Sequence, residues 1–136
     1  MGQLIHGGGI LGKKITEKRR TLDAIDLPAS SAVVEYTSDE VVSNCPVTGQ
    51  PDFYTVTIQL LSSPRGMESK SLKLYLQSFS DDGQFCEAFS DTIAQDVLTC
   101  TGAKSVMVCV KQKPRGGVSI EATSILPITE NYRHGD

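Results

Sequence analysis

Alternation of apolar and polar side chains is the strongest pattern in the chain, and it is clearest in residues 53–61 (FYTVTIQLL). Most residues of this segment are β-branched or aromatic, which is typical of a half-buried β-strand. A shorter β-rich run spans residues 32–37, and valines alternate with polar residues in 104–112. Residues 118–123 follow a Pro-Arg-Gly-Gly turn, so the last two segments predict a β-hairpin.

Two helices are predicted between the second and third strands. Residues 69–79 and 85–98 carry apolar side chains at intervals of three and four, which places them on one helical face. The order strand, strand, helix, helix, strand, strand predicts an α+β domain with a largely antiparallel four-stranded sheet. Two helices leave the other face of such a sheet with little cover, so we expect a homo-oligomer.

The N-terminal segment lacks a comparable pattern, and it combines three consecutive glycines with the charged stretch KKITEKRR. The glycines are not a phosphate-binding loop, because no strand pattern precedes them and no Gly-Lys-Ser/Thr follows. We therefore expect an arm over residues 1–30, either packed on a neighbouring subunit or frayed. Residues 31–136 are expected to form one folded domain.

Composition narrows the classes of function. With 39% hydrophobic and 21% charged residues, the chain has the composition of a globular domain. A net charge of −3 argues against a nucleic-acid-binding surface, although a local patch of Lys111, Lys113 and Arg115 keeps that partner open. No apolar run is long enough to span a bilayer, and the N-terminus lacks the apolar core of a secretory signal.

Four cysteines without a secretory signal predict reduced thiols and a cytoplasmic location, and the absence of a CxxC pair predicts no metal site. Cys45 is the strongest candidate for chemistry, because it lies in a turn-rich loop between the first two strands, shortly before Asp52. A thiol and a carboxylate held together can attack an electrophilic carbon and move a proton to the developing anion. On spacing alone, a structural role for both residues is the more common case.

Residues 45–52 (CPVTGQPD), followed by an aromatic residue, resemble the nucleophile loop of the nitrile reductases of queuosine biosynthesis, the 7-cyano-7-deazaguanine reductases. Residues 68–75 (ESKSLKLY) match the characteristic segment of that family at every position, and residues 85–87 (FCE) stand where the family has Phe-His-Glu. Residues 114–120 match the strand turn near the end of its sequences. These blocks occur in the family's order and cover roughly residues 36–122, which resembles the short, single-module type.

The resemblance implies the tunnelling fold, in which subunits pool their sheets into a barrel and stacked rings place the substrate sites at subunit interfaces. The implied reaction converts the nitrile of 7-cyano-7-deazaguanine (preQ0) to 7-aminomethyl-7-deazaguanine (preQ1) with two NADPH. Cys45 would attack the nitrile carbon to form a thioimide, and Asp52 would supply the proton. Glu87 would accept hydrogen bonds from the guanine-like edge, with Cys86 beside it. The resemblance also implies that Glu68 and Ser69 help to bind the substrate. It implies further that the cofactor phosphates pair with Lys70, Lys73 and Arg115.

Simpler interpretations of these residues stay open. Lys70 and Lys73 have the spacing of any solvated helix face. A carboxylate such as Glu68 is favourable near the positive end of a helix dipole, and Arg115 stands in a turn. Glu87 lies about 200° around its helix from the apolar stripe, so it points to solvent or to an interface.

Two positions depart from the family pattern: Cys86 replaces a His, and Ser80 replaces an Arg. A cysteine is a weaker proton donor than a histidine, which bears on the hydride steps rather than on capture of the nitrile. Two interpretations of Cys86 stay open: it is a partner of the Cys45 thiol, or it is a small buried apolar residue. The alternative function is that of the archaeosine synthases, which resemble this family and add ammonia to the same thioimide to give an amidine, in tRNA or DNA modification. Those relatives are expected to lack residues 68–75, which favours the reductase.

Overall fold

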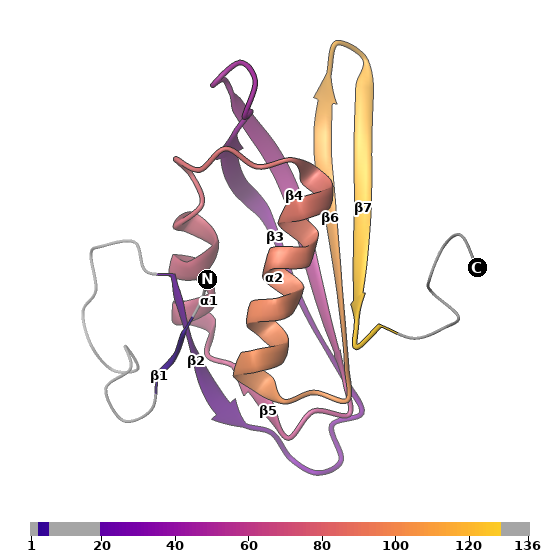
Figure 1. Cartoon of the computed structure of the whole chain (residues 1–136). Helices are drawn as coiled ribbons and strands as arrows, with labels where there is room; N and C mark the ends of the chain where they lie inside the picture. Colours follow the sequence, from indigo (N-terminus) through magenta and orange to yellow (C-terminus); the bar gives the residue numbers. More distant parts are fainter. Residues whose placement is uncertain (1–2, 6–19, 129–136) are drawn as a thin grey trace.

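The computed structural model describes residues 3–5 and 20–128, and its main feature is a twisted antiparallel sheet with two helices on one face (Figure 1). The strand order is β3-β4-β6-β7. The expected α+β class with a four-stranded antiparallel sheet and two helices is therefore confirmed. The elements are β3 (Val33–Asn44), β4 (Pro51–Leu61), α1 (Ser69–Gln77), α2 (Cys86–Thr101), β6 (Ser105–Arg115) and β7 (Val118–Leu126).

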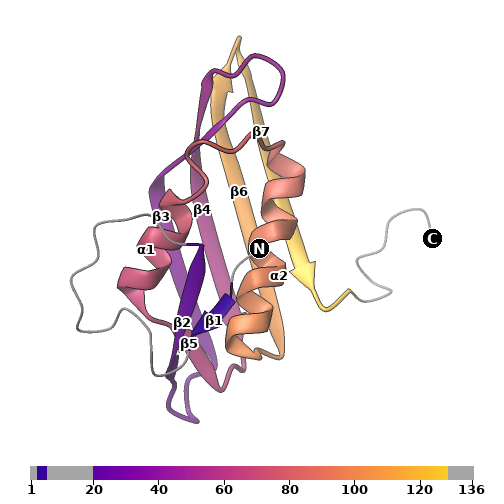
Figure 2. The same cartoon turned by 60° about the vertical axis from the view of Figure 1, so that its left-hand side comes forward.

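The core lies between the sheet and the helices, which share one side of the sheet in both views (Figures 1 and 2). Alternate residues of the two central strands face it, because side chains on a strand point to opposite faces in turn. The core-facing residues of the central strands are Tyr54, Val56, Ile58, Leu60, Val106, Val108 and Val110, each at most 1% exposed, and α2 adds Phe89, Ile93 and Val97.

None of the described helices is long and apolar enough to cross a membrane.

A second, smaller sheet lies beside the helices and was not predicted. It has the order β1-β2-β5, from β1 (Gln3–Ile5), β2 (Thr21–Asp26) and β5 (Arg65–Met67). The sequence analysis placed β2 in the arm, but Leu22 is 1% exposed within the core and the Asp23 amide donates to Ser71 Oγ at 3.0 Å. The packed part of the chain thus begins before residue 31. The glycine run and the charged stretch of the expected arm lie mostly outside the described residues.

The pattern predicted only the first half of β3, because one extra residue in this strand interrupts the alternation of its side chains between the two faces. The register of β3 against β4 shifts by one residue between Ser38 and Val41. Such a bulge turns the following side chains to the opposite face. Val41 and Ser43 consequently face the core, at 2% and 0% exposure. The same shift brings the end of β3, next to Cys45, to the helix-covered side.

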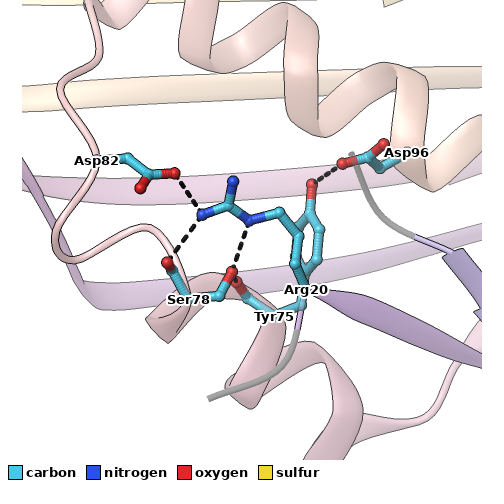
Figure 3. Close-up of polar contacts among 5 residues, drawn as sticks. All are labelled: Arg20, Tyr75, Ser78, Asp82 and Asp96. Atoms are coloured by element: carbon cyan, nitrogen blue, oxygen red, sulfur yellow. Dashed lines mark hydrogen bonds and ion pairs between the residues drawn. The ribbon is translucent and has the colours of Figure 1, made fainter.

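Polar contacts made by Tyr75 and Arg20 hold the helices in place (Figure 3). The Tyr75 hydroxyl of α1 donates to Asp96 Oδ2 of α2 at 2.6 Å, with both residues buried. Burial raises the pKa of Tyr75 far above its usual range, with the Asp96 hydrogen bond as the next cause, so the phenol stays protonated. Arg20 lies over the Phe79 ring at 3.9 Å, donates to the Ser78 carbonyl at 2.8 Å and forms an ion pair with Asp82. These contacts tie the end of α1 to α2 and to the start of β2.

Candidate active site

The β3–β4 loop, residues 45–50, is a closed turn that presents Cys45. The Cys45 amide donates to the Gln50 carbonyl at 2.7 Å, and the Gly49 amide donates to the Cys45 carbonyl at 2.8 Å. Gly49 has φ of 73°, a left-handed conformation that a side chain would strain. The turn is therefore shaped by its own backbone hydrogen bonds.

The segment that joins α1 to α2 supports this turn from the side. Asn44 donates its amide to the Asp82 carbonyl at 2.9 Å and accepts the Gln84 amide at 3.1 Å. Gly83 packs so closely that a Cβ on it would lie 3.2 Å from the Pro46 Cα, so a side chain there would displace the turn. Arg20 holds Asp82 (Figure 3), so the α1–α2 segment links Arg20 to the position of Cys45.

Cys45 differs from the other three cysteines in its ionisation. Hydrogen bonding to the Thr48 side chain, followed by the Thr48 and Val47 amides, lowers the pKa of Cys45 to about 7. A large fraction of the thiol is then thiolate at neutral pH, and the thiolate is the nucleophilic form. In contrast, burial raises the pKa values of Cys86, Cys100 and Cys109.

Asp52 lies on the core-facing side of β4, is 3% exposed and forms an ion pair with Arg115. Arg115 NH1 donates to Asp52 Oδ1 at 2.7 Å, and its NH2 donates to Gln50 Oε1. These interactions raise the pKa of Arg115, with the Asp52 hydrogen bond as the main cause, so the guanidinium stays charged. Asp52 is thus nearly fully buried and has one carboxylate oxygen fixed by a cation.

A register shift in β6 makes this ion pair geometrically feasible. Val106, Val108 and Val110 face the core, so regular alternation would turn Arg115 to the opposite face of the sheet. The pairing of β6 with β7 shifts by one residue between Gln112 and Arg115. The extra residue returns the Arg115 side chain to the face that carries Asp52.

The β3–β4 loop, the first turn of α2 and the β6–β7 turn enclose a cavity of about 500 Å³. All three segments lie at the same end of the sheet (Figures 1 and 2). We call this space the thiol cavity. It brings together five of the predicted site residues, Cys45, Asp52, Cys86, Glu87 and Arg115, and it is also lined by Pro46, Thr48, Gln84, Phe85, Gln112, Gly116 and Ile120.

The walls of the thiol cavity differ in chemical character. Glu87 is exposed in the first turn of α2, as its angle from the apolar stripe predicted, and Phe85 is 60% exposed at the helix start. Cys86 is 1% exposed, and its thiol donates to the Val110 carbonyl at 3.3 Å. The residue in the position of the family histidine therefore borders the cavity but directs its thiol to the Val110 carbonyl of β6, whereas Phe85 and Glu87 are exposed.

The four predicted site residues on α1 lie elsewhere. Ser69 and Lys73 line a second cavity of about 360 Å³ between α1 and β3, which we call the α1 cavity. It shares no lining residue with the thiol cavity. Glu68 caps α1, since its carboxylate accepts the Lys70 amide at 2.9 Å and the Ser71 amide at 2.8 Å. Within one chain, the predicted site residues therefore form two separate groups.

Polar residues of the thiol cavity or its rim that escaped the sequence analysis include Thr48, Gln50 and Gln112. Thr48 and Gln50 fell within the loop that drew attention to Cys45, and the turn composition alone did not show that their side chains contact the site residues. Gln112 shares the core-facing parity of Val108 and Val110, so its position could have been found from the alternation of β6.

The sequence of the chain matches a known protein family and named relatives. The family model described as QueF-like protein matches residues 51–126. The chain is 33% identical to an NADPH-dependent 7-cyano-7-deazaguanine reductase of Frankia casuarinae, over 84% of this chain and 91% of the relative. It is 42% identical to a reductase of the same name from Bacillus mycoides, over 69% of this chain. That match covers 57% of the Bacillus protein, so this chain aligns with little more than half of it.

The fold is also found in a solved structure. The apo form of the archaeosine synthase QueF-Like superposes with a TM-score of 0.66 and 19% sequence identity, covering 71% of this chain and 94% of that one. At this identity the likeness concerns the fold alone. The family model, in contrast, matches the sequence itself over residues 51–126, which carry Asp52, Glu87 and Arg115, and the reductase relatives match most of the chain. The chain therefore belongs to the QueF-like family, together with the NADPH-dependent 7-cyano-7-deazaguanine reductases.

Proposed function

We propose that the chain reduces the nitrile of 7-cyano-7-deazaguanine to 7-aminomethyl-7-deazaguanine through a covalent thioimide on Cys45. As a member of its family the chain is an oxidoreductase that uses NADPH. The observation that carries the mechanism is the combination, in one cavity, of a cysteine whose pKa is about 7 with a buried carboxylate. We place the reaction in the cytoplasm, where a thiol nucleophile stays reduced.

The covalent step needs no group from outside the chain. The Cys45 thiolate adds to the nitrile carbon, which changes the carbon–nitrogen triple bond to a double bond. The Asp52 carboxylate takes the thiol proton and delivers it to the nitrogen, which leaves a neutral thioimide with no net gain or loss of protons. Burial of Asp52 keeps water from competing for this proton.

The cavity walls suit a guanine-like base. A volume of about 500 Å³ is within the range of small-molecule sites. The Glu87 carboxylate can accept two parallel hydrogen bonds from the ring N–H and exocyclic amine of the base. Phe85, with its ring exposed beside Glu87, offers an apolar face for the planar ring.

The site would hold two NADPH molecules one after the other, each of which would supply one hydride to the substrate carbon. The residues assigned to the cofactor phosphates fit that role chemically, since Lys70, Lys73 and Arg115 are cations. However, Lys73 lies in the α1 cavity, away from Cys45. We therefore propose a barrel-forming homo-oligomer of stacked rings, in which α1 of one subunit, with Glu68, Ser69, Lys70 and Lys73, completes the thiol cavity of its neighbour.

Addition of ammonia to the thioimide, giving an amidine, is the second candidate. One observation favours it: Cys86 replaces the family histidine, and its thiol is buried against Val110. A thiol directed to the Val110 carbonyl is poorly placed to protonate the product amine. The names of the sequence relatives favour the reductase.

The test mixes purified protein with 7-cyano-7-deazaguanine and NADPH, and follows nicotinamide absorbance together with intact protein mass. We expect two equivalents of NADPH to be oxidised per nitrile. Cys45→Ala should abolish this oxidation, whereas Cys109→Ala, a matched thiol on β6 outside the thiol cavity, should retain it. A stable adduct on Cys45 without NADPH loss, converted to an amidine by ammonium, would instead establish the second candidate.

A further inference from the structure

Arg115 has a contact that a role in cofactor binding does not explain. Its two terminal nitrogens bind two acceptors on one stretch of chain, Asp52 Oδ1 at 2.7 Å and Gln50 Oε1. The guanidinium is planar, so contacts to two fixed acceptors set its orientation as well as its position. The side chain of Asp52 is 4% exposed and that of Arg115 is 35% exposed. The cation therefore covers the carboxylate from the solvent side.

The local backbone is arranged for this contact. Gln50 and Asp52 stand two residues apart at the start of β4, and the closing hydrogen bond from Cys45 to the Gln50 carbonyl adjoins them. On the opposite strand, the register shift after Gln112 turns Arg115 to the core-facing side. A basic residue that served only the cofactor would not require this reversal.

We infer that Arg115, braced by Gln50, is a positioning residue for Asp52 and acts in the covalent step before any hydride is transferred. The inference rests on the proposed function, and it deepens it by giving Arg115 a task that is independent of the cofactor. With Oδ1 fixed by Arg115, Oδ2 is left to exchange the proton between Cys45 and the nitrile nitrogen. Thiolate addition forms the carbon–sulfur bond, breaks one carbon–nitrogen π bond and leaves the thiol proton on nitrogen.

The two lysines on the same hairpin support a specific role for Arg115. Lys111 and Lys113 are exposed on β6 and line neither cavity. Both precede Arg115 on the strand, and neither has a described contact with Asp52. Lys113→Ala therefore removes a nearby cation without altering the brace, which makes it a matched control.

The experiment measures the rate of adduct formation in the full chain by intact mass, with saturating 7-cyano-7-deazaguanine and no NADPH. We expect Arg115→Met to slow this rate by about ten- to a hundredfold, since small misplacements of a proton-transfer group have effects of this size. Arg115→Lys should recover part of the rate, because an ammonium can reach Asp52 but not both acceptors. Gln50→Leu, at an exposed position, should slow it by less, and Lys113→Ala should match the wild type.

Arg115 also contributes to the lowered pKa of Cys45, so iodoacetamide alkylation at the pH of the adduct assay reports how much thiolate each variant has. Alkylation at about pH 10, where a thiol of ordinary pKa is largely ionised, reports whether the loop is intact. Unchanged alkylation at both pH values together with slow adduct formation supports the inference. An unchanged adduct rate with only a raised KM for NADPH overturns it, as does a parallel loss of adduct formation and alkylation, which would indicate a disrupted loop or less thiolate. A wild-type protein that forms no adduct refutes the proposed function itself, which is a different result.

Discussion

The thiol cavity and the α1 cavity lie on the same side of the sheet but have different contents. The thiol cavity combines a nucleophile of lowered pKa, a buried carboxylate and a braced guanidinium. The α1 cavity offers Ser69, Lys73 and neutral or apolar neighbours from β3 and α1, and Glu40 is its one carboxylate among the described lining residues. One cavity has the means for covalent chemistry and the other has the means to hold a ligand. This difference is what the proposed sharing of one site between neighbouring subunits requires, and the predictions below test it.

The largest expected effect tests whether the chemistry belongs to the thiol cavity. Asp52→Asn removes the group that takes and returns the proton, so adduct formation should slow by about 10²- to 10⁴-fold. Intact mass measured against time, with 7-cyano-7-deazaguanine alone, gives the rate. Asp91→Asn, which removes an exposed carboxylate from α2, is the control and should react like the wild type. Equal rates for both variants would place the proton transfer elsewhere.

The next effect tests whether the two cavities meet between subunits. Cys45→Ala lacks the nucleophile, and Lys73→Glu carries a negative charge where the cofactor phosphates are proposed to bind. In a ring where α1 of one subunit completes the thiol cavity of the next, random mixing of equal amounts restores about a quarter of the sites. NADPH oxidation, measured after the two variants are unfolded together and refolded, would show this recovery.

The control for that mixture combines Cys45→Ala with Asp52→Asn. Both changes lie in the thiol cavity, so no mixed site in the ring contains both native residues. We expect no recovery from this pair. Recovery in the control, or none with Lys73→Glu, would contradict a site shared between neighbours.

A smaller effect concerns the ionisation that distinguishes the thiol cavity. The Thr48 side chain is the main cause of the lowered pKa of Cys45, so Thr48→Val should raise that pKa from about 7 toward the ordinary value. Because a higher pKa leaves less thiolate at neutral pH, a rise of one unit would slow alkylation at pH 7 by about fivefold. The pH dependence of iodoacetamide labelling measures the shift. Thr99→Val, at an exposed position on α2, should leave the profile unchanged.

The sequence predicted the elements whose alternation is uninterrupted, and it missed those that depend on a register shift. Strand β4 was located almost to the residue, because its apolar and polar residues alternate without a break. Strand β3 was ended early, since the bulge after Ser38 reverses the alternation that identifies a strand. Strand β5 is three residues long, and β2 buries the consecutive residues Leu22 and Asp23, so neither shows a countable alternation.

The candidate site shows the same division between features that the sequence predicted and features that depend on strand register. Cys45, Asp52, Glu87 and Arg115 were found from motifs, and the structure gathers them in one cavity. The ion pair between Asp52 and Arg115 joins residues 63 positions apart and depends on the register shift in β6. Local sequence does not encode that register, because it is set by pairing with β7. The direction of the Cys86 thiol toward the Val110 carbonyl likewise follows from how α2 packs on β6.

The smallest expected effect on chemistry tests whether the two cavities share a mechanical support. The Tyr75–Asp96 hydrogen bond joins α1, which lines one cavity, to α2, which lines the other (Figure 3). Tyr75→Phe leaves a buried carboxylate oxygen without this donor, which should lower the free energy of unfolding in urea by about 1–3 kcal/mol. Asp96→Asn keeps an acceptor oxygen for the phenol and should cost less. If Cys45 alkylates at the wild-type rate in Tyr75→Phe, the thiol cavity is set by its own loop and by the α1–α2 segment. A changed rate would show that the helix packing transmits to Cys45, and that the two cavities are coupled within one chain.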